Sequence, residues 1–351
     1  MGSGASIIPG VWLVGTRTEA IAILLLGCLT VQAAAQFKEE KPFAGQDGNV
    51  AVQRWRVGME ITAEGGAFKR IVGATTVPMD WPEQRVRIAE SDLSRGVGVS
   101  YQVVDGAARQ MVIRIPMLAS GETARAVVTF EIHRLLPVPP EDTGAYQLPN
   151  PKRVDRKTAP CLAPSPMIES QHPKIKAAAK EAVAGKERAW ERVEAIYDAV
   201  RKRIEFRDNR GGTVRGAVET LEEGFGDCDE MTSLFVAMCR SLDVPARMVR
   251  VPDHCYPEFY LWDGEGKGHW LPCQVSGARS FGGMPDPRPV LQKGDNVLIA
   301  DPATKKKSRS RFLPETLIGF PAGSGGGTLK PKLVCQQVRE EDEKETADKR
   351  R

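Results

Sequence analysis

The order of apolar and polar positions predicts a strand-rich first part of the chain. Between residues 36 and 147, six short segments alternate apolar and polar side chains, as strands with one buried face do. These segments are residues 55–62, 68–76, 84–89, 98–104, 110–115 and 126–135. Asp105-Gly106 lies between two of them and is typical of a tight hairpin. Short strands at regular spacing predict a β-sandwich-like domain over residues 36–147.

Helical spacing begins only after a stretch that has no periodicity. Residues 136–173 are rich in proline and scattered polar side chains, which predicts a linker over residues 148–174. Residues 189–204 then place apolar side chains three and four positions apart, as a helix with one apolar face does. A second such helix starts at or just after Cys228 and ends before Pro245, because proline cannot continue the hydrogen-bond ladder.

Strand patterns follow this second helix. Residues 246–251, 254–261 and 269–275 read as strands, and residues 296–300 as a further one. Helices beside an antiparallel sheet predict an α+β domain over residues 175–320. Residues 321–351 combine glycines with mixed charges, which predicts a flexible charged tail.

Cys228 is the strongest candidate for chemistry. It follows a glycine-rich turn at the start of a helix, where unpaired N–H groups and the helix dipole favour a thiolate. His254 is the nearest histidine downstream and a candidate base, whereas His269 is predicted to face solvent. Placing His254 opposite Gln274 in an antiparallel pair would put Cys255 opposite Cys273. In an oxidising compartment that register predicts a disulfide between these two cysteines.

These segments resemble the transglutaminase-like superfamily of papain-type Cys-His enzymes, and in particular exported bacterial proteins with such a domain. The resemblance lies in GDC before a helix ending in LDVPARMV, then HCYPEFYL, then HWLPCQ, and covers roughly residues 175–300. It implies a nucleophile helix packed on an antiparallel sheet, with Cys228 as nucleophile and His254 as general base. The family usually carries aspartate at the third catalytic position, in a W-x-P-x-D context. This chain has Gln274 there, and Asp301 is a second candidate for that role.

The resemblance implies thiol-dependent acyl transfer on peptide or protein amides. Water as the acceptor would make the protein a protease or amidase, and an amine as the acceptor would make it a transglutaminase; the sequence leaves both open. The alternative is a non-catalytic binding module that keeps the fold. Gln274 in place of aspartate favours the binding module, whereas intact Cys228 and His254 favour the enzyme.

The charge and the cysteine spacing limit which binding partners and cofactors we expect. The net charge of +4 gives no reason to expect nucleic acid or acidic lipid as a partner. The seven cysteines show no C-x-x-C spacing, so we expect no zinc site, no metal requirement and no cofactor. The oligomeric state stays open.

The first 35 residues predict an export signal. Arg17 precedes an apolar run over residues 20–31, and Ala33, Ala34 and Ala35 suit cleavage before Gln36. The run is shorter than the roughly 20 residues that a membrane span needs. We therefore expect a signal peptide over residues 1–35, a periplasmic or extracellular protein, and no stable membrane span after cleavage. A retained N-terminal membrane anchor is the alternative.

Overall fold

A computed structural model describes residues 48–209, 212–300, 306–323 and 326–338. All of these residues lie in one compact unit, residues 41–351. The predicted signal peptide and Asp301 lie outside the described residues. Within the described part, no helix is long and apolar enough to cross a membrane.

The first part of the chain forms two antiparallel sheets, as predicted. Its strands are β1 (Gly48–Glu64), β2 (Phe68–Val77), β3 (Gln84–Leu93), β4 (Gly98–Val104), β5 (Ala108–Leu118) and β6 (Thr123–Pro137). Buried apolar side chains of β1, β2, β5 and β6 form one core between the sheets. The predicted Asp105-Gly106 turn joins β4 to β5, with φ of 53° and 66° at the two residues.

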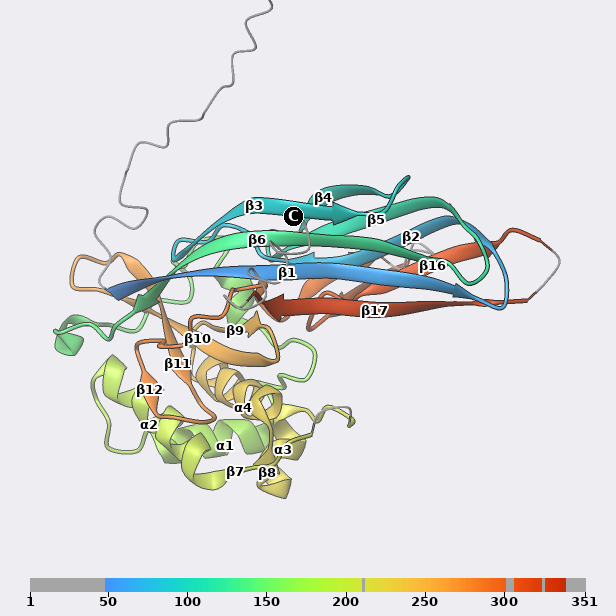
Figure 1. Cartoon of the computed structure of the whole chain (residues 1–351). Helices are drawn as coiled ribbons and strands as arrows, with labels where there is room; N and C mark the ends of the chain where they lie inside the picture. The colour runs from blue at the N-terminus through green and yellow to red at the C-terminus, as the bar shows by residue number, and fades with distance from the viewer. Residues whose placement is uncertain (1–47, 210–211, 301–305, 324–325, 339–351) are drawn as a thin grey trace, which may run out of the picture. The chain divides into compact units, whose positions relative to one another are not determined.

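Two strands from the end of the chain complete this sandwich. The strand β16 (Thr316–Pro321) pairs with β2, and β17 (Thr328–Gln337) pairs with β1. One sheet has the order β17-β1-β6-β3, and the facing one contains β4, β5, β2 and β16 (Figure 1).

The prediction of a flexible tail over residues 321–351 is therefore wrong for residues 328–337. Residues 316–320, which were predicted to end the second domain, belong to the sandwich instead. The strand β17 is an edge strand, with Lys330, Pro331 and Lys332 in its middle. Such residues are common at sheet edges and weaken the apolar alternation by which a strand is recognised. Residues 339–351 lie outside the described part of the chain.

Between the sandwich and the first α-helix, the structure has only short elements. They are the 3₁₀ helices η1 (Thr143–Ala145) and η2 (Ala159–Leu162). Further along the chain, β14 (Val297–Ala300) and β15 (Lys307–Ser310) pair with each other.

The second part packs helices on an antiparallel sheet, in agreement with the predicted fold class. The helices are α1 (Pro173–Ala182), α2 (Ala189–Arg203), α3 (Ala217–Glu223) and α4 (Cys228–Ser241). The sheet contains β9 (Ala246–Val251), β10 (His254–Trp262), β11 (Gly268–Gln274) and β12 (Ser280–Phe281). Two short strands, β7 (Glu205–Phe206) and β8 (Phe225–Gly226), pair in parallel. Helix α4 packs on β9 and β10 and is surrounded by α1, α2 and α3 (Figure 1), so it is buried on all sides rather than on one face.

The strand β13 (Gln292–Lys293) links this sheet to the sandwich, because it pairs with β9 on one side and with β5 on the other. A buried ion-pair network reinforces the link. The Lys293 ammonium is 3% exposed and lies 2.6 Å from both the Glu83 and the Glu258 carboxylates. Burial alone would raise the pKa of Glu258, but the charges of Lys293 and Arg247 outweigh it and lower that pKa to about 2.

Candidate active site

Cys228 is the first residue of α4, and the turn before it fixes its position. Helix α3 ends at Gly224 in the left-handed conformation, with φ of 75°. After β8, Asp227 caps α4: its Oδ1 accepts a hydrogen bond from the N–H of Asp229 at 2.8 Å. The Glu230 carboxylate in turn accepts from the N–H of Asp227 at 2.7 Å, which completes a capping box.

Glu230 is buried and held from two further directions. Its carboxylate lies 3.0 Å from the Arg215 guanidinium and accepts a hydrogen bond of 3.0 Å from the Asn209 amide. A Cβ at Gly226 would lie 2.8 Å from the Glu230 Cβ, so the glycine before the cap is required for this close approach. The helix start that carries Cys228 is therefore rigidly placed.

His254 is placed by a two-residue turn. It is the first residue of β10 and pairs with Val251 at the end of β9, so only Pro252 and Asp253 connect the strands. Asp253 has φ of 54°, which is unusual for a residue with a side chain. The Pro252-Asp253 pair between two strands is a turn signal that is visible in the sequence.

The structure brings Cys228, His254 and Gln274 together. The His254 Nε2 lies 3.4 Å from the Gln274 Oε1. The pKa of the Cys228 thiol falls to about 5 because of hydrogen bonding with the Cys255 thiol, followed by hydrogen bonding with His254 and its positive charge. Burial opposes this shift but is outweighed. With a pKa of about 5, the Cys228 sulfur is a thiolate at neutral pH, and it lies beside His254. The His254 ring in turn contacts the Gln274 side-chain amide.

The strand register behind this arrangement differs from the predicted one. The strands β10 and β11 pair Glu258 with Pro272, a register shifted by two residues from the expected one. If this register is continued along the strands, Gln274 lies opposite Tyr256 and therefore diagonally across from His254. Long side chains can bridge such a diagonal separation. The reason is the turn: Asp263 accepts hydrogen bonds from the N–H groups of Glu265 and Lys267, which fixes where the strands begin to pair.

The shifted register also removes the predicted disulfide. Cys255 does not lie opposite Cys273, and both are buried free thiols. His269 lies near the other end of the β10–β11 pair, opposite Leu261. Its Nε2 is 2.7 Å from the Asp263 carboxylate.

Several groups near Cys228 were not anticipated from the sequence. The Cys255 thiol donates to the Asp229 carboxylate at 2.8 Å and to the backbone oxygen of Cys228 at 3.4 Å. The Arg311 guanidinium donates to the backbone oxygen of Asp229 at 2.6 Å. Alternation along β10 does place Cys255 and His254 on opposite faces, and α4 covers the Cys255 face. The contact between Cys255 and Asp229 depends on this packing of α4 against β10, which strand alternation does not reveal.

Burial and the charges of Cys228 and His254 shift the pKa values of two nearby carboxylates, Asp227 and Asp286. Burial and the neighbouring Cys228 charge raise the pKa of Asp227 to about 6. Asp286 lies in the loop after β12, paired with Arg288 at 2.6 Å. Burial would raise the pKa of Asp286, but Arg288 and the charge of His254 lower it.

One cluster in the described part of the chain could hold a metal ion. The sulfurs of Cys228 and Cys255 and a carboxylate oxygen of Asp229 lie within 4.8 Å of one another. Two thiolates and a carboxylate would suit a thiophilic cation such as Zn²⁺. A structural zinc site would need a fourth ligand.

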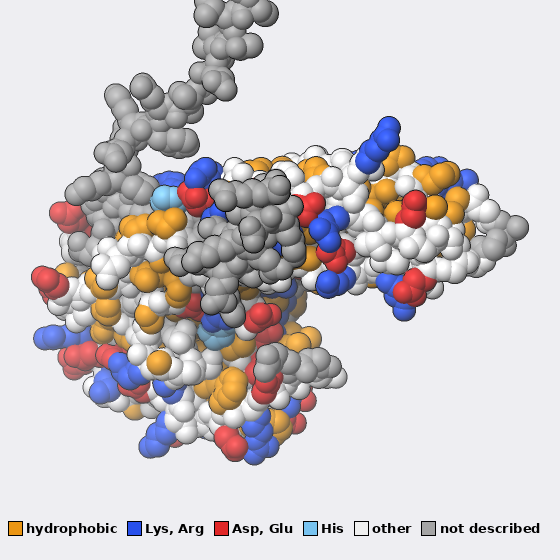
Figure 2. Space-filling view, viewed as in Figure 1, with side chains coloured by type: hydrophobic (Ala, Val, Ile, Leu, Met, Phe, Trp, Pro, Cys, Tyr) orange, Lys and Arg blue, Asp and Glu red, His pale blue; other side chains and the backbone are white. Residues whose placement is uncertain are grey.

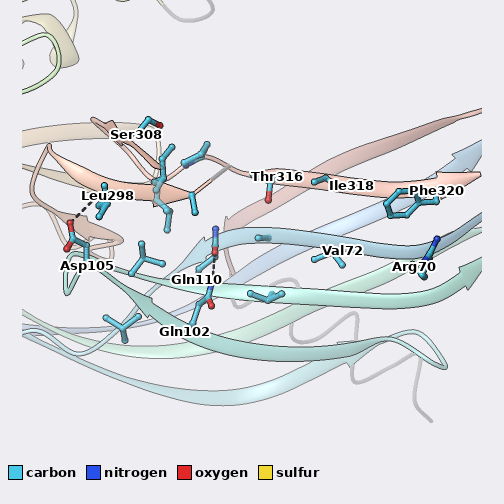
Figure 3. Close-up of a pocket in the computed structure, with 18 residues that line it drawn as sticks. Arg70, Val72, Gln102, Asp105, Gln110, Leu298, Ser308, Thr316, Ile318 and Phe320 are labelled. Carbon is cyan, nitrogen blue, oxygen red and sulfur yellow. Dashed lines mark hydrogen bonds between the residues drawn. The ribbon is translucent and has the colours of Figure 1, made fainter. Parts of the chain in front are cut away.

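A large groove lies away from this chemistry. It has a volume of about 1070 Å³ and opens over β2, β4, β5 and β16, with β14 and β15 along one side (Figure 3). Its walls include Val72, Ile318 and Phe320, with Arg70 and Asp105 as its charged side chains. No histidine or cysteine lines it. On the face shown in Figure 2, positive and negative side chains are interspersed rather than gathered by sign.

Comparison with known proteins relates part of this chain to a family. Residues 176–275 match the model of the transglutaminase-like superfamily, a range that contains Cys228, His254 and Gln274. No curated protein matches the sequence.

One solved structure shares this fold, and a second is less similar. One, described as "a Putative Cysteine Protease from Cytophaga hutchinsonii", has a TM-score of 0.54 at 16% identity, over 83% of this chain and 93% of that chain. The periplasmic domain of TgpA from Pseudomonas aeruginosa bound to ethylmercury has a TM-score of 0.30 at 13% identity, over 62% of this chain and 88% of that chain. The second score is too low to support an argument.

Proposed function

Because residues 176–275 form a transglutaminase-like domain, we propose that the protein catalyses thiol-dependent acyl transfer on peptide or protein amides. The observation that carries the proposal is the Cys228 thiol, whose pKa is about 5 at a capped helix start beside His254. A nucleophilic cysteine needs such a low pKa and a neighbouring base.

The mechanism follows from these positions. The Cys228 sulfur attacks the amide carbonyl, and the backbone N–H of Cys228 helps to hold the developing oxyanion, because the first N–H groups of a helix have no partner within it. His254 gives its proton to the leaving amine, which leaves a thioester on Cys228. His254 then takes a proton from water or from an incoming amine, and the acyl group leaves the sulfur.

Gln274 is the proposed orienting residue. Its Oε1 can accept the Nε2–H of His254, which fixes the ring tautomer and turns the other nitrogen toward Cys228. An amide cannot stabilise the imidazolium as strongly as a carboxylate does. Asp286, whose pKa responds to the charge of His254, supplies negative charge near the same ring.

The first experiment is an assay of both acceptor reactions. An unfolded protein such as casein is incubated with the enzyme and a fluorescent primary amine, and cleavage and amine incorporation are followed in parallel. Cleavage supports a protease, and incorporation supports a transglutaminase. Either activity should disappear in Cys228→Ala and fall in His254→Ala. Activity that survives Cys228→Ala would refute the proposal.

The alternative proposal is a non-catalytic binding module, which Gln274 in place of the usual carboxylate favours. The groove of about 1070 Å³ on the sandwich is consistent with such a role. A binding module would keep its partner when Cys228 is replaced by alanine and would form no covalent intermediate. The two proposals therefore differ in whether an acyl group is ever found on the sulfur.

We also propose that the protein is exported to the periplasm or the cell exterior, on the evidence of the apolar run and small residues before Gln36. Mass analysis of the protein isolated from its own cells tests this. Export with cleavage predicts an N-terminus at Gln36. A retained leader in the membrane fraction would indicate the anchored alternative.

A further inference from the structure

One thiol beside Cys228 forms and breaks no bond in the proposed acyl transfer. Cys255 follows His254 on β10, and its sulfur lies within 4.8 Å of the Cys228 sulfur. It donates a hydrogen bond to the Asp229 carboxylate at 2.8 Å, so a proton acceptor is already in contact with it. A structural cysteine in an apolar core needs neither neighbour.

The two thiols differ sharply in accessibility. Cys255 is 1% exposed, and burial raises its pKa well above that of a free thiol. Cys228 is partly exposed and is a thiolate at neutral pH. Of the other thiols in the described part of the chain, Cys239 and Cys273 are buried, Cys161 is half-buried and Cys335 is exposed. Within the Cys228–Cys255 pair, an oxidant reaches Cys228 first, because Cys255 is 1% exposed and Cys228 is partly exposed.

We propose that Cys228 and Cys255 form a reversible disulfide when the protein meets a peroxide. The Cys228 thiolate attacks a hydroperoxide and takes its terminal OH, which gives a sulfenic acid. The departing alkoxide, or hydroxide from hydrogen peroxide, takes up the proton that the Cys228 thiol had released and leaves as an alcohol or water. Asp229 takes the Cys255 proton, and the Cys255 sulfur attacks the Cys228 sulfur. The S–S bond forms as the S–O bond breaks, and the departing hydroxide takes the proton from Asp229 and leaves as water. Two thiols lose two electrons and the peroxide gains them.

The disulfide has two consequences. It removes the nucleophile, so the proposed acyl transfer stops until a thiol reductant restores it. It also protects Cys228 from oxidation to sulfinic acid, which thiol reductants do not reverse. The first consequence depends on the proposed function, whereas disulfide formation itself does not.

Peptide mapping tests the inference without any substrate. The full chain is treated with hydrogen peroxide, its remaining thiols are blocked with iodoacetamide, and it is digested without reduction. We expect a crosslinked pair of peptides that contain Cys228 and Cys255. The mass of this pair should be two hydrogens below the sum of the two reduced peptides. Alkylation of Cys228 should be lost on treatment and return after dithiothreitol.

Two variants sharpen the result. In Cys255→Ser, peroxide should carry Cys228 to the sulfinic acid, and dithiothreitol should not restore its alkylation. Cys273→Ser, which removes another buried thiol of the same sheet, should behave as the wild type. A wild-type crosslink between other cysteines, or wild-type overoxidation of Cys228 equal to that in Cys255→Ser, would overturn the inference. The wild-type map decides the question even if Cys255→Ser does not fold.

The outcomes also separate this inference from the proposed function. A Cys228–Cys255 crosslink in a protein that transfers no acyl group would uphold the disulfide and count against the enzyme. Acyl transfer by a wild-type protein that never forms the crosslink would support the enzyme and overturn the proposed disulfide.

Discussion

Replacing His254 by alanine should raise the pH at which Cys228 becomes reactive. In the native site, hydrogen bonding with Cys255 and with His254, together with the histidine charge, holds the Cys228 pKa at about 5. The variant loses both contributions of the ring but keeps Cys255. Its thiol pKa should therefore settle between that value and the free-thiol value of about 8.5.

The size of the effect follows from these pKa values. A pKa of about 5 instead of about 8.5 means that the native site favours the thiolate by roughly 5 kcal/mol. At pH 6 about 90% of Cys228 is thiolate, against about 0.3% of a free thiol, a ratio of roughly 300. A thiolate of low pKa is a weaker nucleophile, with a Brønsted slope of about 0.45, which costs roughly 40-fold. The net gain in alkylation rate at pH 6 is only about eightfold, so the midpoint of the pH profile is more diagnostic than the rate.

The assay is alkylation of the reduced protein by iodoacetamide from pH 4 to pH 9, with the modified Cys228 peptide quantified by mass spectrometry. The wild type should give a midpoint near 5 and His254→Ala a midpoint above about 6.5. His269→Ala is the matched control and should leave the midpoint unchanged, because that ring pairs with Asp263. A wild-type midpoint near 8.5, or equal shifts in both variants, would refute the reasoning.

Three further predictions concern the surroundings of the site. Lys293→Met should destabilise the protein by about 2–3 kcal/mol in urea unfolding, because the Glu258 and Glu83 carboxylates each lose one of two cationic partners and keep only Arg247 and Arg134, respectively. Lys332→Met on the surface should cost below about 1 kcal/mol. Asp227→Asn keeps the cap. The stability contributed by the raised pKa of Asp227 is fully present below about pH 4 and is lost as pH rises through about 6, so the variant should gain stability relative to the wild type mainly above pH 6. It should also lower the alkylation midpoint of Cys228, and an unchanged midpoint would contradict this. Gln274→Ala loses a hydrogen bond worth about 1 kcal/mol and should therefore slow acyl transfer roughly fivefold. Gln274→Glu keeps an oxygen acceptor and should retain the native rate or exceed it. Equal losses of rate in both variants would argue against an orienting role for Gln274.

The sequence predicted most elements because their patterns are local. The apolar spacing after Cys228 and the strand at 246–251 depend on neighbouring residues alone, and the structure has both. The strand β17 was missed because an edge strand with Lys330 and Pro331 need not alternate. Its partner β1 is far away in sequence, so no local pattern reveals the pairing.

The sequence predicted that Cys228, His254 and Gln274 lie close together, but it did not predict the geometry that brings them together. Cys228, His254 and Gln274 carry recognisable surroundings, and the structure places them together. The register was wrong by two residues, because the hydrogen bonds of Asp263 set the turn length and the sequence does not show them. The contact between Cys255 and Asp229 depends on how α4 packs against β10, a long-range relation that strand alternation cannot supply.

The central claim is that Cys228 accepts an acyl group, and burst kinetics with p-nitrophenyl acetate test it most directly because an activated ester needs no specific substrate. The account predicts a burst of p-nitrophenol stoichiometric with the protein, with the acetyl group mapped to Cys228 by mass spectrometry. The burst should be absent in Cys228→Ala and slower in His254→Ala at pH 6. A protein that gives no burst, or that carries the acetyl group on another residue, would contradict the account.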